Sequence, residues 1–527
     1  MAYVLSAGLL FSLVLGCAQS TTPTPVPAAT ASVVPSTTAV AGVAPSATAR
    51  LTRIPRPSAT ASPTPSATPS PLHSPTRRPT RTPRPSATAS PVPSTTSSPV
   101  PSPTPSRYPT PIASIFGMHM EGEMARGNEL DLALDAGLRW VRYRVLDWDR
   151  IEPQHTDPPT YHWEVVDEAG LQEMARRGIT VIAQVQFTPE WAQAAPGSFC
   201  GPVKDDAFPD LARFLQAAVA RYSGAPYHVR YWELGNEPDA GLGLVPPRSV
   251  FGCWGDPGDE YYGGRAYAQM LKVTYPAIKA QDPSALVLNG GLLLDRPSGG
   301  NDTHPRFLEG ILEGGGGDYF DILSFHAYSH YLGPRQMGNP SWPGSPTVMP
   351  AKVAFIRDLL ARYGHGDKPL MNTESALQCG EPTAECLDMQ AVHAARSYAE
   401  AMSLGLVAQI HYAWINEHWR HTGLVMTDLK TKPVYYAYQA AASFLAGASY
   451  RGPAAGYPAG VQGLAFITAA GGELLDVVWS RDGQAREVEL PEGTLAYDHH
   501  GKPIPIDGAL VLTGDPVYVV RGDGTAP

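Results

Sequence analysis

Two glutamates at the ends of short apolar segments are the residues of this chain whose type and spacing most clearly predict chemistry. Glu237 follows the segment 230–234, and Glu374 follows the segment 370–373. Cleavage of a glycosidic bond needs one carboxylic acid to protonate the leaving oxygen and one carboxylate at the anomeric carbon. The tripeptide Asn236-Glu237-Pro238 alone is a weak signal, because most glutamates are merely solvated. A second glutamate at a strand end makes a catalytic pair the favoured interpretation.

The elements that would position this pair alternate between β-rich runs and helical patterns from residue 112 to residue 447. Helices are expected between the strands, for example at 205–221, 260–281 and 390–404. This alternation predicts an α/β fold, a (β/α)8 TIM barrel, whose active site lies at the carboxyl ends of the strands. Glu237 and Glu374 would end its fourth and seventh strands. The eight strands are expected at 115–118, 140–144, 181–186, 230–234, 286–289, 322–325, 370–373 and 409–414.

The pattern changes after residue 447. Segments at 463–468, 474–479, 486–490 and 508–520 are expected to be strands, and turns such as Arg481-Asp482-Gly483 separate them. A small antiparallel, sandwich-like β domain is therefore predicted over residues 448–527. It carries no evident catalytic group, so it is interpreted as a packing module for the barrel, with carbohydrate binding as the alternative.

The first 111 residues predict a signal and a tether. Residues 4–16 are apolar but too short to span a bilayer, and Cys17 follows them directly. Residues 1–18 therefore resemble a bacterial lipoprotein signal whose Cys17 is acylated, although an ordinary secretory signal or a start upstream of Met1 stays open. Residues 19–111 are almost entirely Pro, Ser, Thr, Ala and Val, which predicts a disordered linker. The expected location is the bacterial cell surface, with a membrane lipid as partner.

Charge and cysteine usage narrow the function class further. The net charge is -10 although the tether contains arginines and no acidic residue, so the folded part is acidic and a nucleic-acid partner is not expected. Besides Cys17 there are four cysteines. We predict the disulfides Cys200 to Cys253 and Cys379 to Cys386, typical of an oxidising compartment, with four unpaired thiols as the alternative.

Across residues 112–527 the chain resembles the clan A glycoside hydrolases. In that clan an Asn precedes the acid/base Glu at the end of strand four, and the nucleophile Glu ends strand seven. Asn236, Glu237 and Glu374 match this pattern, and the segments 140–142, 151–153, 161–163 and 188–191 also fit. The segment 232–239 and the trailing β domain favour the family 39 and family 51 branches. The resemblance implies a retaining glycosidase that acts on a carbohydrate substrate without a cofactor.

Further strand-end side chains would complete such a site. Asn236 could bond the sugar 2-hydroxyl, Arg142 could keep Glu374 ionised, and Tyr328 could orient Glu374. Trp414 could form an apolar floor under the sugar ring, with plain core packing as the alternative. The remaining candidates for contact with the sugar are His326, which could instead be a hydrogen-bonded barrel histidine, and His119 and Gln186.

Several alternatives stay open. The histidines 411, 418 and 421 lack the spacing of a zinc site, so no metal is expected. A glycan-binding surface lipoprotein without turnover, an adhesion or scaffold protein and a transglycosylase are the competing functions. The sugar, the linkage and the choice between exo and endo action depend on long loops such as 240–259 and 329–349.

Overall fold

The computed structural model describes residues 114–122, 127–241, 245, 249–295, 306–469 and 471–522. The predicted signal with Cys17 and the predicted tether lie outside these residues. Among the helices described, none combines the length and the apolar character needed to cross a membrane.

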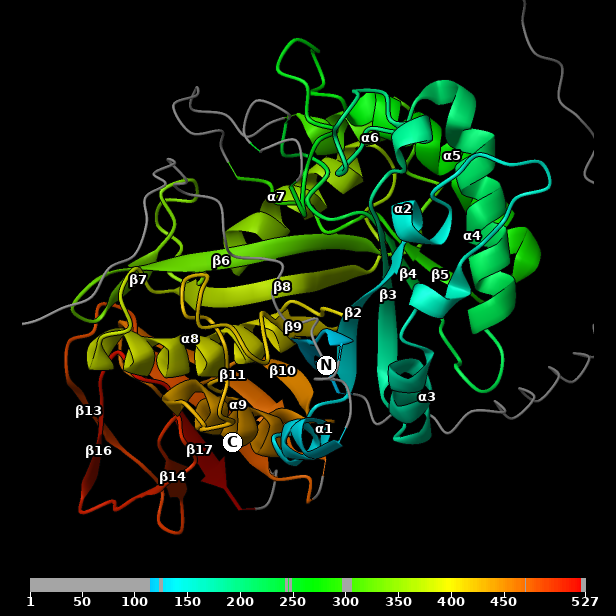
Figure 1. Cartoon of the computed structure of the whole chain (residues 1–527). Coiled ribbons are helices and arrows are strands. Elements are labelled where there is room, and N and C mark those ends of the chain that lie inside the picture. Colours follow the sequence, from blue (N-terminus) through cyan, green and yellow to red (C-terminus); the bar gives the residue numbers. More distant parts are fainter. Residues whose placement is uncertain are drawn as a thin grey trace, which may run out of the picture. The chain divides into compact units, whose positions relative to one another are not determined.

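In the described residues, eight parallel strands form a barrel (Figure 1). Hydrogen-bonded neighbours follow the order β5-β4-β3-β2-β1-β9-β8-β6. The parallel bridges Leu288 to Ile322 and Leu292 to Phe325 close the ring between β5 and β6. The predicted TIM barrel is therefore confirmed. Its strands are β1 (Phe116–His119), β2 (Trp140–Asp147), β3 (Thr180–Gln186), β4 (Tyr231–Leu234), β5 (Leu286–Leu288), β6 (Leu323–Gly333), β8 (Leu370–Gln378) and β9 (Gln409–His411), and β7 (Gln336–Gly338) pairs with β6 as a hairpin.

Amphipathic helices surround the barrel. In α4, for example, Leu211, Leu215 and Ala218 repeat at helical spacing and are buried. Side chains cap two of the helices: Asp167 accepts from the backbone of Gly170, and Thr383 accepts from that of Cys386. The helices are α1 (Gly127–Asp135), α2 (Trp148–Ile151), α3 (Glu168–Arg176), α4 (Phe208–Tyr222), α5 (Gly264–Gln281), α6 (Phe307–Glu313), α7 (Met349–Arg362), α8 (Ala384–Ser403) and α9 (Pro433–Leu445).

The two ends of the barrel interior differ in polarity. Near the amino ends of the strands an apolar cluster that includes Trp140, Ile182 and Met371 fills the ring. Toward the carboxyl ends, ionisable side chains such as Arg142 and Glu233 are fully buried instead. Buried charges persist only when they are paired, so this end needs a network of charge pairs.

The carboxyl-terminal strands form a β-sandwich beside α8 and α9 (Figure 1). One described sheet has the order β10-β11-β12-β17-β14-β15, and β13 pairs with β16. Val478, Leu510 and Val519 pack within this domain, and Phe444 of α9 stacks on Tyr518 at 4.5 Å between ring centroids. The predicted β domain is confirmed. Its strands are β10 (Ser449–Pro453), β11 (Val461–Ile467), β12 (Leu474–Ser480), β13 (Arg486–Glu489), β14 (Leu495–Tyr497), β15 (Pro503–Ile504), β16 (Ala509–Leu512) and β17 (Val517–Arg521).

Some predicted boundaries were wrong. The single strand expected at 508–520 is two strands, β16 and β17, because Gly514 and Pro516 lie in the turn between them and proline lacks the N–H that a ladder needs. The last barrel strand ends at His411 rather than at residue 414. Four of the described strands were not predicted, because they are short and two of them contain proline: β7, β10, β14 and β15.

Both predicted disulfides are present. Cys200 and Cys253 join the segments that follow β3 and β4, and Cys379 and Cys386 close a loop between β8 and α8. Their Cα–Cα distances of 5.4 and 6.0 Å fit the ordinary range for a disulfide. The alternative of four unpaired thiols is wrong.

Candidate active site

The two glutamates lie together at the carboxyl end of the barrel. Glu237 follows β4 and Glu374 lies in β8, and each is less than a tenth exposed. A carboxylate oxygen of each lies within 4.8 Å of the other and of a ring nitrogen of His326. Strands four and seven of the barrel therefore bring the predicted pair into one buried cluster.

Glu237 has a strained backbone. Its φ angle is +49°, which is rare for a residue with a side chain and costs about 1–3 kcal/mol. The backbone N–H of Glu237 donates to the carbonyl oxygens of Gly290 and Gly291, at 2.9 and 3.1 Å, and these bonds hold it in place. Such strain is typical of functional sites, where the surrounding structure fixes one side-chain position.

His326 lies between the two carboxyl groups. Its Nδ1 is 2.7 Å from Oε1 of Glu237 and 3.5 Å from Oε2 of Glu374. Burial lowers the pKa of His326 to about 4, so the ring is neutral near pH 7. His326 therefore bonds Glu237 without adding a positive charge to the site. The interpretation as a hydrogen-bonded barrel histidine describes its Nδ1, and its contact with a sugar stays a prediction.

Glu237 has the titration behaviour of a proton donor. Burial raises its pKa to about 7, and the negative charge of Asp295 acts in the same direction. The positive charges of Arg142 and Lys352 oppose this shift but do not cancel it. A carboxyl group with such a pKa holds a proton for part of the time at neutral pH, as a general acid must.

Glu374 is held by donors on both oxygens. Arg142 donates from Nη1 to Oε1, and the Tyr328 hydroxyl donates to Oε2. Burial raises the pKa of Tyr328 well above its ordinary value, and the charge of Glu374 adds to this, so the hydroxyl keeps its proton. Donors on both oxygens fix the orientation of the carboxylate.

Arg142 is the hub of this network. Its Nε donates to Oε2 of Glu233 at 2.5 Å, and its Nη2 donates to Oδ1 of Asn236 at 2.9 Å. Burial disfavours the charge of Arg142, but the carboxylates of Glu233 and Glu374 outweigh it and raise its pKa. One guanidinium thus connects strands two, four and seven and positions Asn236, which is itself partly exposed.

The structure places His119 and Gln186 at strand ends but not in direct contact with the pair. Nε2 of His119 lies 3.0 Å from Oε1 of Glu121, and the ring packs near Tyr412 at 4.9 Å between centroids. Gln186 donates from Nε2 to the carbonyl oxygen of Val250 at 3.3 Å. Among the described residues, no hydrogen bond or ion pair joins either side chain to the two glutamates. Their contact with a sugar stays a prediction.

The expected floor at Trp414 finds no support. This side chain has no exposed surface, and its ring contacts Tyr435 of α9 at 6.4 Å between centroids. Core packing, the alternative, describes it better. Tyr412 and Trp419 pack instead against Tyr328, at 6.2 and 5.3 Å, and both are partly exposed. The chain leaves β9 at His411, so Tyr412 rather than Trp414 is the aromatic residue near Glu374.

A partly buried ion pair near Glu237 was not predicted from the sequence. Nζ of Lys352 lies 2.8 Å from Oδ1 of Asp295 and also donates to the carbonyl oxygen of His326 at 2.8 Å. The sequence did indicate that Lys352 is buried, because it shares the core-facing side of α7 with Met349 and Ile356 at helical spacing. A lysine at such a position must find a buried partner.

Glu233 lies inside a predicted strand, and no role was predicted for it. It has no exposed surface and pairs with Arg142. A parallel strand is buried on both faces, so a charged residue inside it already indicates a partner on a neighbouring strand.

Solved structures share this architecture. One is a family 39 glycoside hydrolase from Bacteroides cellulosilyticus WH2, with a TM-score of 0.59 and 22% identity over 78% of this chain and 82% of that chain. A GH39 β-xylosidase from Caulobacter crescentus has a TM-score of 0.51 and 16% identity over 79% of this chain and 97% of that chain. A GH30 endoxylanase from Clostridium papyrosolvens C71 has a TM-score of 0.51 and 14% identity over 78% of this chain and 96% of that chain.

No protein-family model and no curated protein matches the chain. At these identities the structural neighbours establish the fold. At the level of the fold, they agree with the resemblance to clan A hydrolases near family 39 that the sequence predicted.

Proposed function

We propose that this protein is a retaining glycoside hydrolase that cleaves O-glycosidic bonds of oligo- or polysaccharides. The observation that carries the proposal is the close approach of Glu237 and Glu374 around His326, within 4.8 Å. One carboxyl group has a raised pKa, and the other is held by Arg142 and Tyr328. Environments that differ in this way assign an acid and a nucleophile.

The proposed reaction has two displacements. In the first, a Glu374 oxygen attacks the anomeric carbon while Glu237 gives its proton to the leaving oxygen, so that the glycosidic bond breaks and a glycosyl ester forms. In the second, the ionised Glu237 takes a proton from water, which attacks the same carbon and releases Glu374. Each step inverts the carbon once, so the product keeps the substrate's configuration.

The spacing supports retention over inversion. Retaining enzymes hold their carboxyl groups about 5 to 5.5 Å apart, and inverting enzymes about 6.5 to 9.5 Å apart to admit a water. One oxygen of Glu237 lies within 4.8 Å of one oxygen of Glu374, which falls on the retaining side of this division.

The substrate class has to be identified by screening. The neighbours described above include a β-xylosidase and an endoxylanase, so aryl β-xylosides and xylan are the first candidates. Aryl glucosides, galactosides, arabinosides and uronides complete the panel, and product sizing separates exo from endo action. Binding without turnover would instead indicate a glycan-binding protein, and sugar transfer to an added acceptor would indicate a transglycosylase.

The test separates the two carboxyl roles. Glu374→Ala should abolish turnover of every substrate, whereas Glu237→Ala should still cleave aryl glycosides with good leaving groups, which depart without protonation. Azide should then give a glycosyl azide of unchanged anomeric configuration. The matched control is Glu190→Ala, since Glu190 is exposed. An inverted wild-type product, or near-normal turnover by Glu374→Ala, would refute the mechanism.

We further propose that the enzyme is held at the bacterial cell surface by acylation of Cys17, with residues 19–111 as the tether. The apolar segment before Cys17 and the Pro/Ser/Thr composition after it support this. Cys17→Ser should abolish labelling by a fatty-acid analogue and release the protein from membranes. Unchanged membrane fractionation would rule out this anchor.

A further inference from the structure

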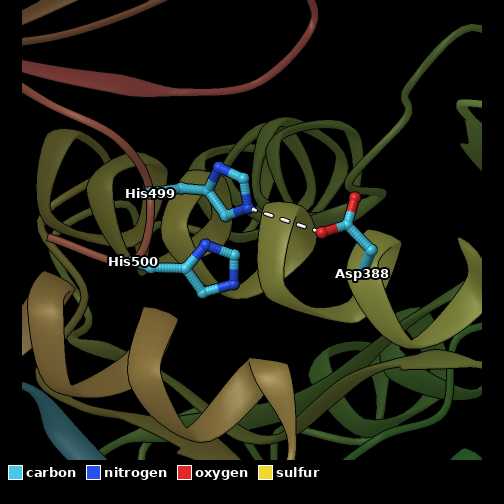
Figure 2. A group of neighbouring side chains, drawn as sticks. All are labelled: Asp388, His499 and His500. Carbon is cyan, nitrogen blue, oxygen red and sulfur yellow. Dashed lines mark ion pairs between the residues drawn. The ribbon is translucent and has the colours of Figure 1, made fainter. Parts of the chain in front are cut away.

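A second cluster of metal-ligating side chains lies away from the two glutamates, between the barrel and the β domain. Asp388 belongs to α8, and His499 and His500 belong to the turn between β14 and β15 (Figure 2). One ligand atom from each of the three lies within 4.8 Å of the others. Asp498 fixes the turn, because its Oδ1 accepts from the backbone of His500 and Lys502, both at 2.9 Å.

His499 has an unsatisfied ring nitrogen at this place. The residue is 7% exposed, and its Nε2 has no hydrogen-bond partner among the described residues. Nε2 lies 3.9 Å from Oδ1 of Asp388, which is too far for a hydrogen bond. Figure 2 shows this nitrogen directed at the Asp388 carboxylate, with the His500 ring alongside. An unpaired buried polar atom is destabilising, so a ligand that bonds it would be stabilising.

The distance suits a shared ion. Zinc binds imidazole nitrogen and carboxylate oxygen at about 2.0 to 2.2 Å, so in a tetrahedral site two such atoms lie roughly 3.4 Å apart. A small rotation of the Asp388 side chain would close the difference from 3.9 Å. The rings of His499 and His500 have centroids 4.1 Å apart, which brings a second imidazole to the same place.

A neighbouring residue holds the other oxygen of Asp388. Arg335 donates to Oδ2 of Asp388 and also pairs with Asp515, which leaves Oδ1 of Asp388 directed toward His499. A carboxylate that ligates a metal is commonly bonded by another residue in this way.

The cluster is open to solvent, because the Asp388 side chain is partly exposed. His500 and Gly501 also line a surface hollow of about 630 Å³ between α1 and α9.

We propose that Asp388, His499 and His500 bind a divalent transition-metal ion, zinc in the first instance, with water as the remaining ligand. The ion would connect α8 of the barrel to the β14–β15 turn of the β domain. Its role would be structural, and the proposed hydrolysis does not depend on it.

The experiment uses the purified full chain after dialysis against a chelator. Isothermal titration with Zn²⁺ should give one saturable site, and Zn²⁺ should raise the unfolding temperature by a few degrees. His499→Ala and the isosteric Asp388→Asn should each weaken binding at least tenfold and remove the rise. If His499→Ala fails to fold, Asp388→Asn alone tests the contribution of the cluster to Zn²⁺ binding. Bound Co²⁺ should show the visible absorption bands of a four-coordinate site.

Two controls assign the ion to this cluster. Glu374→Gln disrupts the other three-ligand group, formed by Glu237, His326 and Glu374, and should leave Zn²⁺ binding unchanged. His162→Ala removes an exposed histidine and should also have no effect. The absence of saturable binding, or binding lost in Glu374→Gln but kept in His499→Ala, would overturn the proposal. Glycosidase activity is measured separately, so its failure would not affect this result.

Discussion

Nζ of Lys352 lies 2.8 Å from Oδ1 of Asp295, and this ion pair sets part of the field around Glu237. Burial is the largest cause of the raised pKa of Glu237, with Asp295 acting in the same direction and Lys352 in the opposite one. Lys352 is buried and donates to the carbonyl oxygens of Leu293 and His326, at 2.6 and 2.8 Å, which holds the cation in place. The proposed acid is therefore tuned by residues outside the strand that carries it.

Removal of the Asp295 charge should make Glu237 a stronger acid. In Asp295→Asn the neighbouring negative charge is lost, so the pKa of Glu237 falls from about 7. The acid must be protonated for the first step, and activity is therefore lost as pH rises through its pKa. The alkaline limb of the kcat/KM profile should move to lower pH, with a several-fold loss at pH 8. Asp358→Asn, an exposed control on α7, should leave the profile unchanged.

The raised pKa of Glu237 should also appear as a cost in stability. Its pKa is about 7 in the folded state, against an ordinary value of 4.5 for a glutamate, so the folded protein holds more protons between these values. This contribution favours folding at low pH and is lost as pH rises from about 4.5 to about 7. Glu237→Gln should therefore stabilise the protein at pH 8, by up to about 3 kcal/mol.

Urea unfolding of wild type and Glu237→Gln at pH 4 and pH 8 measures this effect. The gain from the substitution should be larger at pH 8, and Glu190→Gln should show no such difference. An equal effect at both pH values would contradict the assignment of a raised pKa to Glu237.

Arg142 should matter for both chemistry and folding. Arg142→Lys keeps a charge but cannot donate at once to Glu233, Glu374 and Asn236. Glu233 is fully buried, and a buried carboxylate that loses its partner costs about 3–5 kcal/mol. We expect kcat to fall at least a hundredfold. Glu233→Gln with intact Arg142 should destabilise the fold less, and equal kcat in Arg142→Lys and wild type would refute the hub role.

The sequence predicted the ring of strands and the approach of the two glutamates, because both follow from local patterns. Strand-helix alternation brings the carboxyl ends of all the parallel strands to the same end of the barrel. Glu237 and Glu374 therefore come together although 137 positions separate them. Trp414 was misjudged because the direction of a side chain depends on where β9 ends, and propensity does not locate that point. The burial of Lys352 could have been inferred from its core-facing position on α7, but its partner Asp295 lies in a loop, and no periodicity specifies that pairing.

The aromatic residues around Tyr328 give the sharpest contrast between site and core. Tyr412 and Trp419 are partly exposed beside Tyr328, whereas Trp414 is fully buried against Tyr435. Tyr412→Ala should raise KM or lower kcat/KM by tenfold or more while the unfolding temperature changes little, because it removes a surface for the sugar. Trp414→Ala should instead cost about 3–5 kcal/mol of stability, as large core truncations do, and the folded fraction should keep its KM. Steady-state kinetics and thermal unfolding of both variants check this, and a raised KM in Trp414→Ala with unchanged stability would restore Trp414 as the floor of the site.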